Sequence, residues 1–192
     1  MKRFTRMISL VLVLCMVFSL LPMAFAAEKY DEIGSGKTVI LHSNDVHGEI
    51  TGYAYMKALK TKLEAAGAEV ILADAGDYSQ GETSVSLTKG ANAVDMMNAV
   101  GYDVVTLGNH EFDYGYPQLM ENMNKANFKV LCADVLKEDG TPIFDANTII
   151  EKGGVKIGFF GMETPETQTK ANPALIKGLT FLTESTETTI WE

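Results

Sequence analysis

Cysteine is scarce in this sequence, with only Cys15 and Cys132 among its 192 residues. Cys15 lies in an N-terminal segment that we expect to be removed, so the mature chain has no second cysteine for an internal disulfide. Cys132 falls in the apolar run at 130–133, and we expect it to be a buried strand residue. The fold must therefore rest on a hydrophobic core, and 46% hydrophobic residues are enough to build one.

Positive charge is also in short supply. The chain has 16 Lys and Arg against 25 Asp and Glu, which gives a net charge of −9. Loss of residues 1–26 removes three basic residues and no acidic one, and this leaves −12. Nucleic-acid polymers need a basic surface, so they are excluded as partners. Small phosphate substrates fit this charge only if metal ions invert the local potential.

The sequence has no low-complexity tract and no internal repeat beyond strand–helix alternation, and its length predicts one domain. We assign residues 27–36 to a flexible linker and 37–192 to the domain. Residues 34–38 resemble the end of a phosphate-binding loop, but Asp31 stands where that motif needs glycine. The segment also precedes a predicted strand instead of following one, so an NTPase is not indicated.

The N-terminus predicts a signal peptide at 1–26. Three basic residues within the first six precede an apolar run at 8–21, and Ala-Phe-Ala at 24–26 forms a small-x-small cleavage site. The alternative is an uncleaved membrane anchor, because the run is nearly long enough to span a bilayer. Pro22 and the Ala-x-Ala motif favour cleavage. We therefore expect a secreted or cell-envelope protein with no stable membrane insertion after cleavage.

Hydrophobic patterning predicts an α/β domain. Apolar, β-branched runs without polar alternation are typical of buried parallel strands, and they occur at 37–43, 69–74, 103–107 and 128–134. Between them lie segments with helical character, at 52–66, 90–100 and 116–126. The pattern then changes, because turn sequences at 139–140 and 152–154 predict an antiparallel hairpin that pairs 148–151 with 155–161.

Polar motifs follow three consecutive predicted strands. Asp45 and His47 follow the first, Asp77 follows the second, and Asn109 and His110 follow the third. The spacing from His47 to Asp77 is 30 residues and from Asp77 to Asn109 is 32, the length of one strand–helix–strand unit. Parallel strands therefore bring all five side chains to the carboxyl edge of one sheet, where open α/β sheets bind ligands.

The same residues indicate a metal site. Mixed carboxylate, imidazole and amide ligands suit Zn, Mn or Fe better than Ca or Cu(I). Asp77 and Asn109 each follow a glycine, which lets the backbone come close to a ligand. A carboxylate such as Asp77 can bridge two metals, and such pairs serve phosphate-ester displacement. The alternative is that polar residues gather at strand ends because loops are polar, but three such motifs in succession favour the metal site.

These motifs resemble those of the calcineurin-like metallophosphoesterase superfamily: Asp-x-His at 45–47, Gly-Asp at 76–77 and Gly-Asn-His-Glu at 108–111. Longer segments resemble the secreted 5′-nucleotidase branch, at 40–48, 97–103, 108–115 and 154–167. The resemblance spans about residues 37–182. It implies a layered α/β/β/α sheet with helices on its faces, here C-terminally truncated, and metal-dependent hydrolysis of nucleotide phosphate esters.

The resemblance also implies roles for single residues. Asp45 and His47 would bind a first divalent ion, Asp77 would bridge, and Asn109 would bind a second, with Mn, Zn, Co or a similar metal in each place. His110 would contact the phosphoryl group instead of a metal.

Asp113 would be the carboxylate partner that favours a charged imidazolium on His110. Its alternative role is the N-cap of the following helix. His42 is not assigned as a ligand, and we expect it to pack or hydrogen-bond at its strand end.

The sequence departs from the family in one respect. The family's site takes further histidines from later segments, including a Gly-His-x-His pair, but this chain has none beyond His110. We therefore interpret 37–192 as the N-terminal portion of a catalytic domain that is inactive alone, with a small nucleotide or phosphate ester as the substrate of the complete enzyme. The alternative is a catalytically inactive secreted relic that binds metal or ligand.

Overall fold

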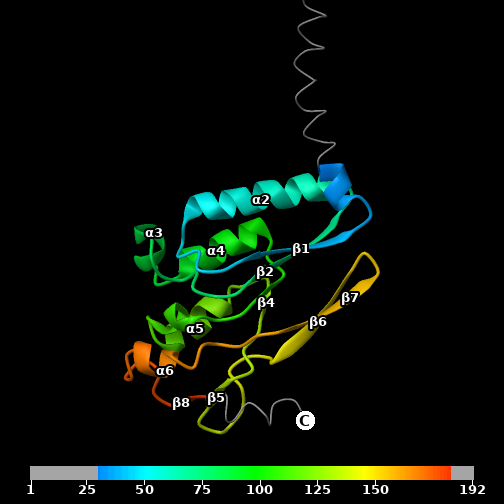
Figure 1. Ribbon diagram of the computed structural model, residues 1–192. Coiled ribbons are helices and arrows are strands. Elements are labelled where there is room, and N and C mark those ends of the chain that lie inside the picture. Colours follow the sequence, from blue (N-terminus) through cyan, green and yellow to red (C-terminus); the bar gives the residue numbers. More distant parts are fainter. Residues whose placement is uncertain (1–29, 183–192) are drawn as a thin grey trace, which may run out of the picture.

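A parallel sheet forms the centre of the computed structural model, which describes residues 30–182. Its strand order β1-β2-β3-β4 follows the order of the sequence (Figure 1). All neighbouring strands are parallel, which confirms the predicted α/β class. The strands are β1 (Thr38–Ser43), β2 (Glu69–Asp74), β3 (Val104–Val105) and β4 (Lys129–Val130). The last two are shorter than predicted, and the predicted signal peptide lies outside the described residues.

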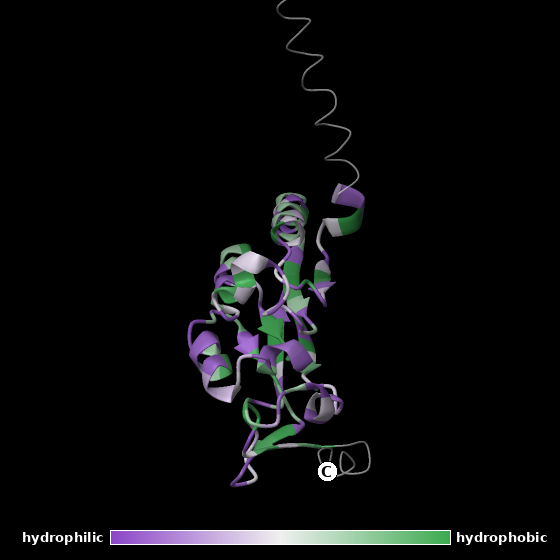
Figure 2. Cartoon of the chain, turned by 90° about the vertical axis from the view of Figure 1, so that its left-hand side faces the viewer, coloured by the Kyte–Doolittle hydropathy of each residue, from purple (hydrophilic) through white to green (hydrophobic). Residues whose placement is uncertain are grey.

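Helices cover one face of this sheet (Figure 1). Val39 and Val70 point to that face and pack against Leu63, and the hydrophobic residues concentrate on the central strands (Figure 2). The three longer helices lie close to their predicted positions, at α2 (Ile50–Ala65), α4 (Ala91–Val100) and α5 (Tyr116–Met123). Three shorter helices also lie within the described residues: α3 (Thr83–Ser86), α6 (Thr167–Lys170) and the 3₁₀ helix η1 (Asn109–Phe112).

A β-hairpin lies beside the opposite face. Its strands β6 (Asn147–Lys152) and β7 (Val155–Phe160) pair antiparallel, as predicted. The turn consists of two glycines with φ of 58° and 75°, which glycine adopts without steric cost. Lys152 anchors the hairpin to the sheet, because its Nζ lies 2.9 Å from Asp103 Oδ1 and donates to the carbonyl of Val70 at 2.6 Å.

The segment after β4 differs from the prediction of one strand over 128–134. The chain leaves the sheet after Val130, and Cys132 lies between two strands instead of within one, although it is fully buried as expected. Its backbone N–H donates to the carbonyl of Asp145. The next strand, β5 (Val135–Lys137), pairs antiparallel with β8 (Leu179–Phe181). This pair was not predicted, because its partners lie far apart in the sequence.

The segment predicted as a flexible linker is helical over residues 30–34. Tyr30 packs against the cluster of buried residues around Leu63 and Ala68, and the ammonium group of Lys62 lies 5.4 Å from the centre of its ring. As predicted, residues 34–38 lead into a strand and do not open a helix. None of the helices within 30–182 has the length and apolar character needed to cross a bilayer.

Candidate metal and phosphate site

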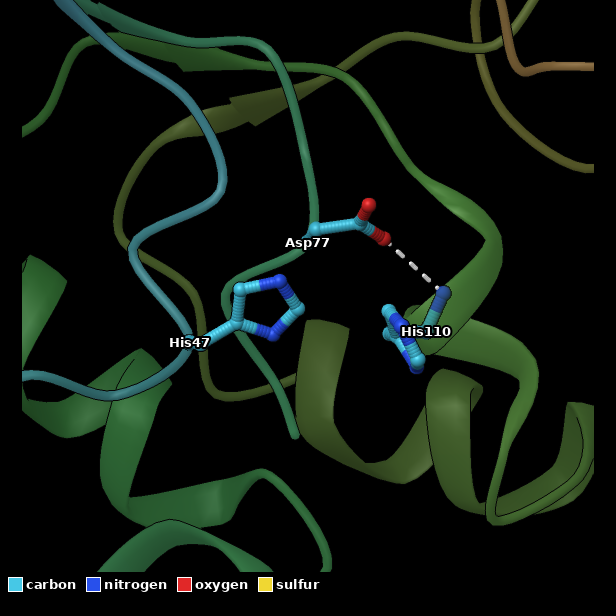
Figure 3. Close-up of side chains that lie close together, drawn as sticks. All are labelled: His47, Asp77 and His110. Atoms are coloured by element: carbon cyan, nitrogen blue, oxygen red, sulfur yellow. Dashed lines mark hydrogen bonds between the residues drawn. The ribbon is translucent and has the colours of Figure 1, made fainter. Parts of the chain in front are cut away.

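Three loops meet at the carboxyl edge of the parallel sheet. The loop after β1 donates to the loop after β2 twice, from Asp45 N to Gly76 O and from His47 N to Asp77 O, both at 3.0 Å. The loop after β3 joins them, because the backbone N–H of His110 donates to Asp77 Oδ1 at 2.9 Å (Figure 3). Parallel strand ends thus place four of the predicted site residues side by side.

The backbone at these positions is strained. Asp45, His47 and Asp77 have φ of 52°, 49° and 60°, and Lys89 is the only other non-glycine residue in the described chain with a positive φ. The left-handed region costs about 1–2 kcal/mol per residue, and such strain clusters at functional sites. Three residues predicted to bind metal therefore have this rare conformation in common.

His47, Asp77 and His110 form a cluster that could hold a metal ion. One potential ligand atom from each lies within 4.8 Å of the other two, and all three side chains are half-buried (Figure 3). The rings of His47 and His110 meet edge to face, with centroids 5.1 Å apart. Two imidazoles and a carboxylate are suitable ligands for a divalent transition metal. By distance alone, His110 could be a ligand as well as a contact to substrate.

The environment of His47 leaves one ring nitrogen available to bind a metal ion. Its Nδ1 lies 2.9 Å from the carbonyl oxygen of Gln80, so that nitrogen carries the proton and Nε2 keeps its lone pair. Nε2 lies 3.9 Å from Asp45 Oδ1, which brings the exposed Asp45 next to the cluster. The role of Gln80 has no sequence signal, since any residue offers a carbonyl.

His110 forms the expected pair with Asp113. Its Nδ1 lies 2.7 Å from Asp113 Oδ2. The N-cap of α5 is Gly115, so the alternative role of Asp113 as that N-cap is wrong. Partial burial opposes a charge on His110, but the hydrogen bond and charge of Asp113, together with Asp77, outweigh it and raise the pKa of His110. The pair therefore favours an imidazolium, and its Nε2–H is available to donate to a bound anion.

The other predicted residues lie on either side of this cluster. Asn109 begins η1 directly before His110 and is half-buried, and its role as a ligand stays a prediction. His42 is exposed and lines a cavity of about 230 Å³ between the sheet and the hairpin, and the lining of that cavity does not include the three cluster residues. The exposed side chain of His42 differs from the expectation that it packs at its strand end, and its exclusion from the ligand set stays a prediction.

Two buried carboxylates behind the loops were not assigned any role from the sequence. Asp74 accepts hydrogen bonds from Ser43 Oγ and from the backbone of Gly76, and its burial raises its pKa to about 7. Glu111 is 3% exposed and accepts backbone hydrogen bonds from both neighbouring loops. The only sequence signal for Glu111 was its place in the Gly-Asn-His-Glu motif.

Comparison with known proteins places this geometry in context. The family model described as calcineurin-like phosphoesterase matches residues 38–188. A 5′-nucleotidase of Vibrio cholerae is 34% identical over 167 residues, covering 81% of this chain and 30% of the relative. A snake venom 5′-nucleotidase of Gloydius brevicauda is 37% identical over 163 residues, covering 73% and 28%. The chain thus spans about 30% of the length of these relatives.

A solved structure shows the same likeness. The 5′-nucleotidase precursor from Thermus thermophilus superimposes with a TM-score of 0.66 at 27% identity, over 76% of this chain and 32% of that one. The parallel sheet and the loops at its carboxyl edge lie within the segment that the family model matches.

Proposed function

The chain belongs to the calcineurin-like phosphoesterase family, and we propose that the complete protein hydrolyses phosphate esters of nucleotides with two divalent metal ions. The observation that carries this proposal is the convergence of His47, Asp77 and His110 from three separate strand ends. The names of the relatives, 5′-nucleotidases from bacteria and snake venom, support a nucleotide as the substrate.

The residues at the site fit divalent ions of the Mn, Zn or Co type. In this proposal Asp45 and His47 would hold the first ion, Asp77 would contribute to both, and Asn109 would contribute to the second. When bound, the ions supply Lewis acidity toward phosphate oxygens and lower the pKa of water. The carboxylates then gain a counter-charge, which an acidic chain needs before it can attract a phosphate.

The protein's own contribution to the chemistry centres on His110. Asp113 holds the Nδ1 proton and orients the ring, so Nε2 presents a second N–H to a phosphoryl oxygen. A fixed positive donor stabilises the charge that develops on the oxygens during in-line displacement. His47 is held by Gln80 in the tautomer that suits a ligand, and it does not exchange protons in this scheme.

The chain itself supplies too few ligands for two tightly held ions. It contains no histidine beyond His110, and stable sites of this kind use about four ligands per ion. We therefore propose that residues 37–192 are the N-terminal portion of the catalytic domain and bind one ion weakly. Venom relatives and the N-terminal apolar run support export of the protein.

Metal titration combined with a hydrolysis assay tests this proposal. The chain from Ala27 onward is titrated with Mn²⁺ by calorimetry and assayed with a nucleoside monophosphate. We expect weak binding of one ion and very slow hydrolysis. In the complete protein, Asp77→Ala abolishes metal binding and activity, whereas His110→Ala keeps the metals and lowers kcat. Turnover of about 1–1,000 per second by the short chain would contradict the assigned ligand set.

A catalytically inactive metal-binding relic is the second candidate, because the described residues bring together one cluster of three potential metal ligands, His47, Asp77 and His110. Metal stoichiometry in the longest natural form of the protein separates the two. Two ions per molecule support the enzyme, whereas one loosely held ion or none supports the relic.

A further inference from the structure

Glu111 is a buried acidic side chain without a counter-ion. It is 3% exposed, and it forms no ion pair with any residue in the described part of the chain. An isolated carboxylate in such a place costs several kcal/mol unless hydrogen bonds compensate for the lost water. The hydrogen bonds that its two carboxylate oxygens accept therefore indicate the role of Glu111.

Four backbone N–H groups from two loops donate to this carboxylate. Oε1 accepts from Tyr78 N and Ser79 N, each at 3.0 Å. Oε2 accepts from Asp77 N at 2.8 Å and from Gly108 N at 2.6 Å. Three of the donors follow β2 and one follows β3. One side chain thus binds the loop that carries Asp77 to the loop that carries Asn109.

The two loops are in direct contact, so a small movement of one displaces the other. A Cβ added to Gly76 would lie 2.4 Å from the backbone nitrogen of Gly108, and one added to Gly108 would lie 2.4 Å from Asp77 Oδ1. Asp77 also holds a left-handed backbone with φ of 60°. Without the hydrogen bonds to Glu111, that strain has less to oppose it, and the loop can relax toward ordinary φ values.

We propose that Glu111 is a positioning residue that fixes Asp77 relative to Asn109, and thereby sets the geometry in which the two residues share metal ions. This inference rests on the proposed metal site. Glu111 is not itself a ligand in this arrangement, because backbone donors occupy both of its oxygens. Loss of a residue that orients metal ligands typically weakens metal affinity about 10–100-fold.

Two variants and one control test the proposal in the mature chain. Glu111→Gln keeps the size of the side chain but replaces one acceptor oxygen with a donor, so it can accept from one pair of amides only. Glu111→Asp keeps the charge but is one methylene too short to reach both loops. Glu163→Gln is the control, since Glu163 is equally buried and contacts none of the four amides.

Two readouts are measured for each variant: amide hydrogen exchange by NMR, and Co²⁺ affinity from its visible absorption. We expect Glu111→Gln to lower the protection of the amides of Tyr78, Ser79 and Gly108 by about tenfold or more. Co²⁺ affinity falls about 10–100-fold, with a changed absorption spectrum. Glu111→Asp lies between the wild type and Glu111→Gln, and it supplies the measurement if Glu111→Gln does not fold. The control leaves Co²⁺ affinity unchanged and does not lower the protection of these amides.

The outcomes separate this proposal from the proposed function. Unchanged affinity and unchanged protection in a folded Glu111 variant overturn the positioning role. Equal losses in the Glu163→Gln control also overturn it, because they indicate general destabilisation. A wild-type chain that binds no Co²⁺ overturns the metal site itself, while the exchange data still decide whether Glu111 holds the loops together.

Discussion

The site loops and the β6–β7 hairpin both turn the chain through left-handed backbone positions, but different residue types occupy these positions. At the site, non-glycine residues take left-handed backbone conformations, and side-chain carboxylates hold the loops in place. In the hairpin, the left-handed positions at 153 and 154 belong to glycines, and the remaining residues form a regular ladder. The hairpin is free of strain but exposed, with Ile149 70% accessible.

Left-handed non-glycine residues lower the stability of the fold, and in this comparison they occur at the site and not in the hairpin turn. A left-handed Asp or His is retained where its side chain must point at one place, and the surrounding hydrogen bonds over-determine its conformation. A hairpin turn has no such requirement, so glycine serves there.

Adding a methyl group at the loop contact has the largest expected effect. Gly76→Ala places a Cβ 2.4 Å from the backbone of Gly108 at a φ of 101°, so both strain and overpacking arise. We expect a loss of about 3 kcal/mol or more in the free energy of unfolding. Gly154→Ala is the control, since φ is 75° but nothing lies within 4 Å, and it costs about 1 kcal/mol. Urea denaturation measures both, and equal losses would contradict the role of the contact.

Removing the ion pair that anchors the hairpin ranks second. Lys152→Met leaves the partly buried Asp103 without its cation and the carbonyl of Val70 without its donor. We expect a loss of about 2 kcal/mol. Lys156→Met is the matched control on the same hairpin, because its pair with Glu151 is exposed and spans 3.7 Å, so it costs under about 0.5 kcal/mol. A loss at Lys156 as large as that at Lys152 would exclude the anchoring role.

The stability of the fold is expected to depend on pH because of Glu163, which follows the hairpin. Glu163 is 3% exposed, accepts from the hydroxyl of Thr167, and leaves Oε2 without a partner. Burial raises its pKa from 4.5 to about 8. The unfolded chain releases this proton above about pH 4.5 while the folded chain retains it, so stability falls as pH rises toward about 8.

Glu163→Gln removes this contribution and flattens the profile. Relative to wild type, the variant gains about 1 kcal/mol or more between pH 4.5 and pH 8. Thermal unfolding across that range checks the result. Parallel profiles of the two proteins would show that Glu163 ionises normally in the folded chain.

The smallest change in stability is expected when the pair of His110 and Asp113 is broken. Asp113→Asn removes the charge that favours an imidazolium, so the pKa of His110 falls while the free energy of unfolding changes by under about 1 kcal/mol. NMR titration of the His110 ring in the wild type and in Asp113→Asn measures the pKa. A His110 pKa that does not move would mean that the carboxylate does not govern its charge.

The parallel sheet was predictable from the sequence because its signal is local. Each strand is an apolar run, and the polar residue at its end marks the carboxyl edge, so residues such as His47, Asp77 and His110 could be expected to meet. The hairpin was predictable for a similar reason, since two adjacent glycines define its turn. The ends of β3 and β4 were not, because tertiary hydrogen bonds decide where the ladder stops, such as those from Thr106 Oγ1 to Leu131 and Met162.

The residues that hold the site side chains in place could not be predicted from the sequence. Glu111 acts through backbone N–H groups whose direction exists only after two loops have packed, and Gln80 acts through a carbonyl that every residue has. The β5–β8 pair joins Val135 to Phe181, and no local pattern links positions so far apart. Sequence patterns thus predicted which side chains meet at the sheet edge better than the contacts that hold them in place.

The order of the strands also bears on how the protein is made. Because β1, β2, β3 and β4 are neighbours in the order of synthesis, each new strand emerges from the ribosome beside a partner that is already present. We expect the edge that gathers His47, Asp77 and His110 to assemble once β3 has left the exit tunnel, before the hairpin is translated. Limited proteolysis of nascent chains arrested near residue 150 would detect this, and full cleavage within residues 38–112 would refute it.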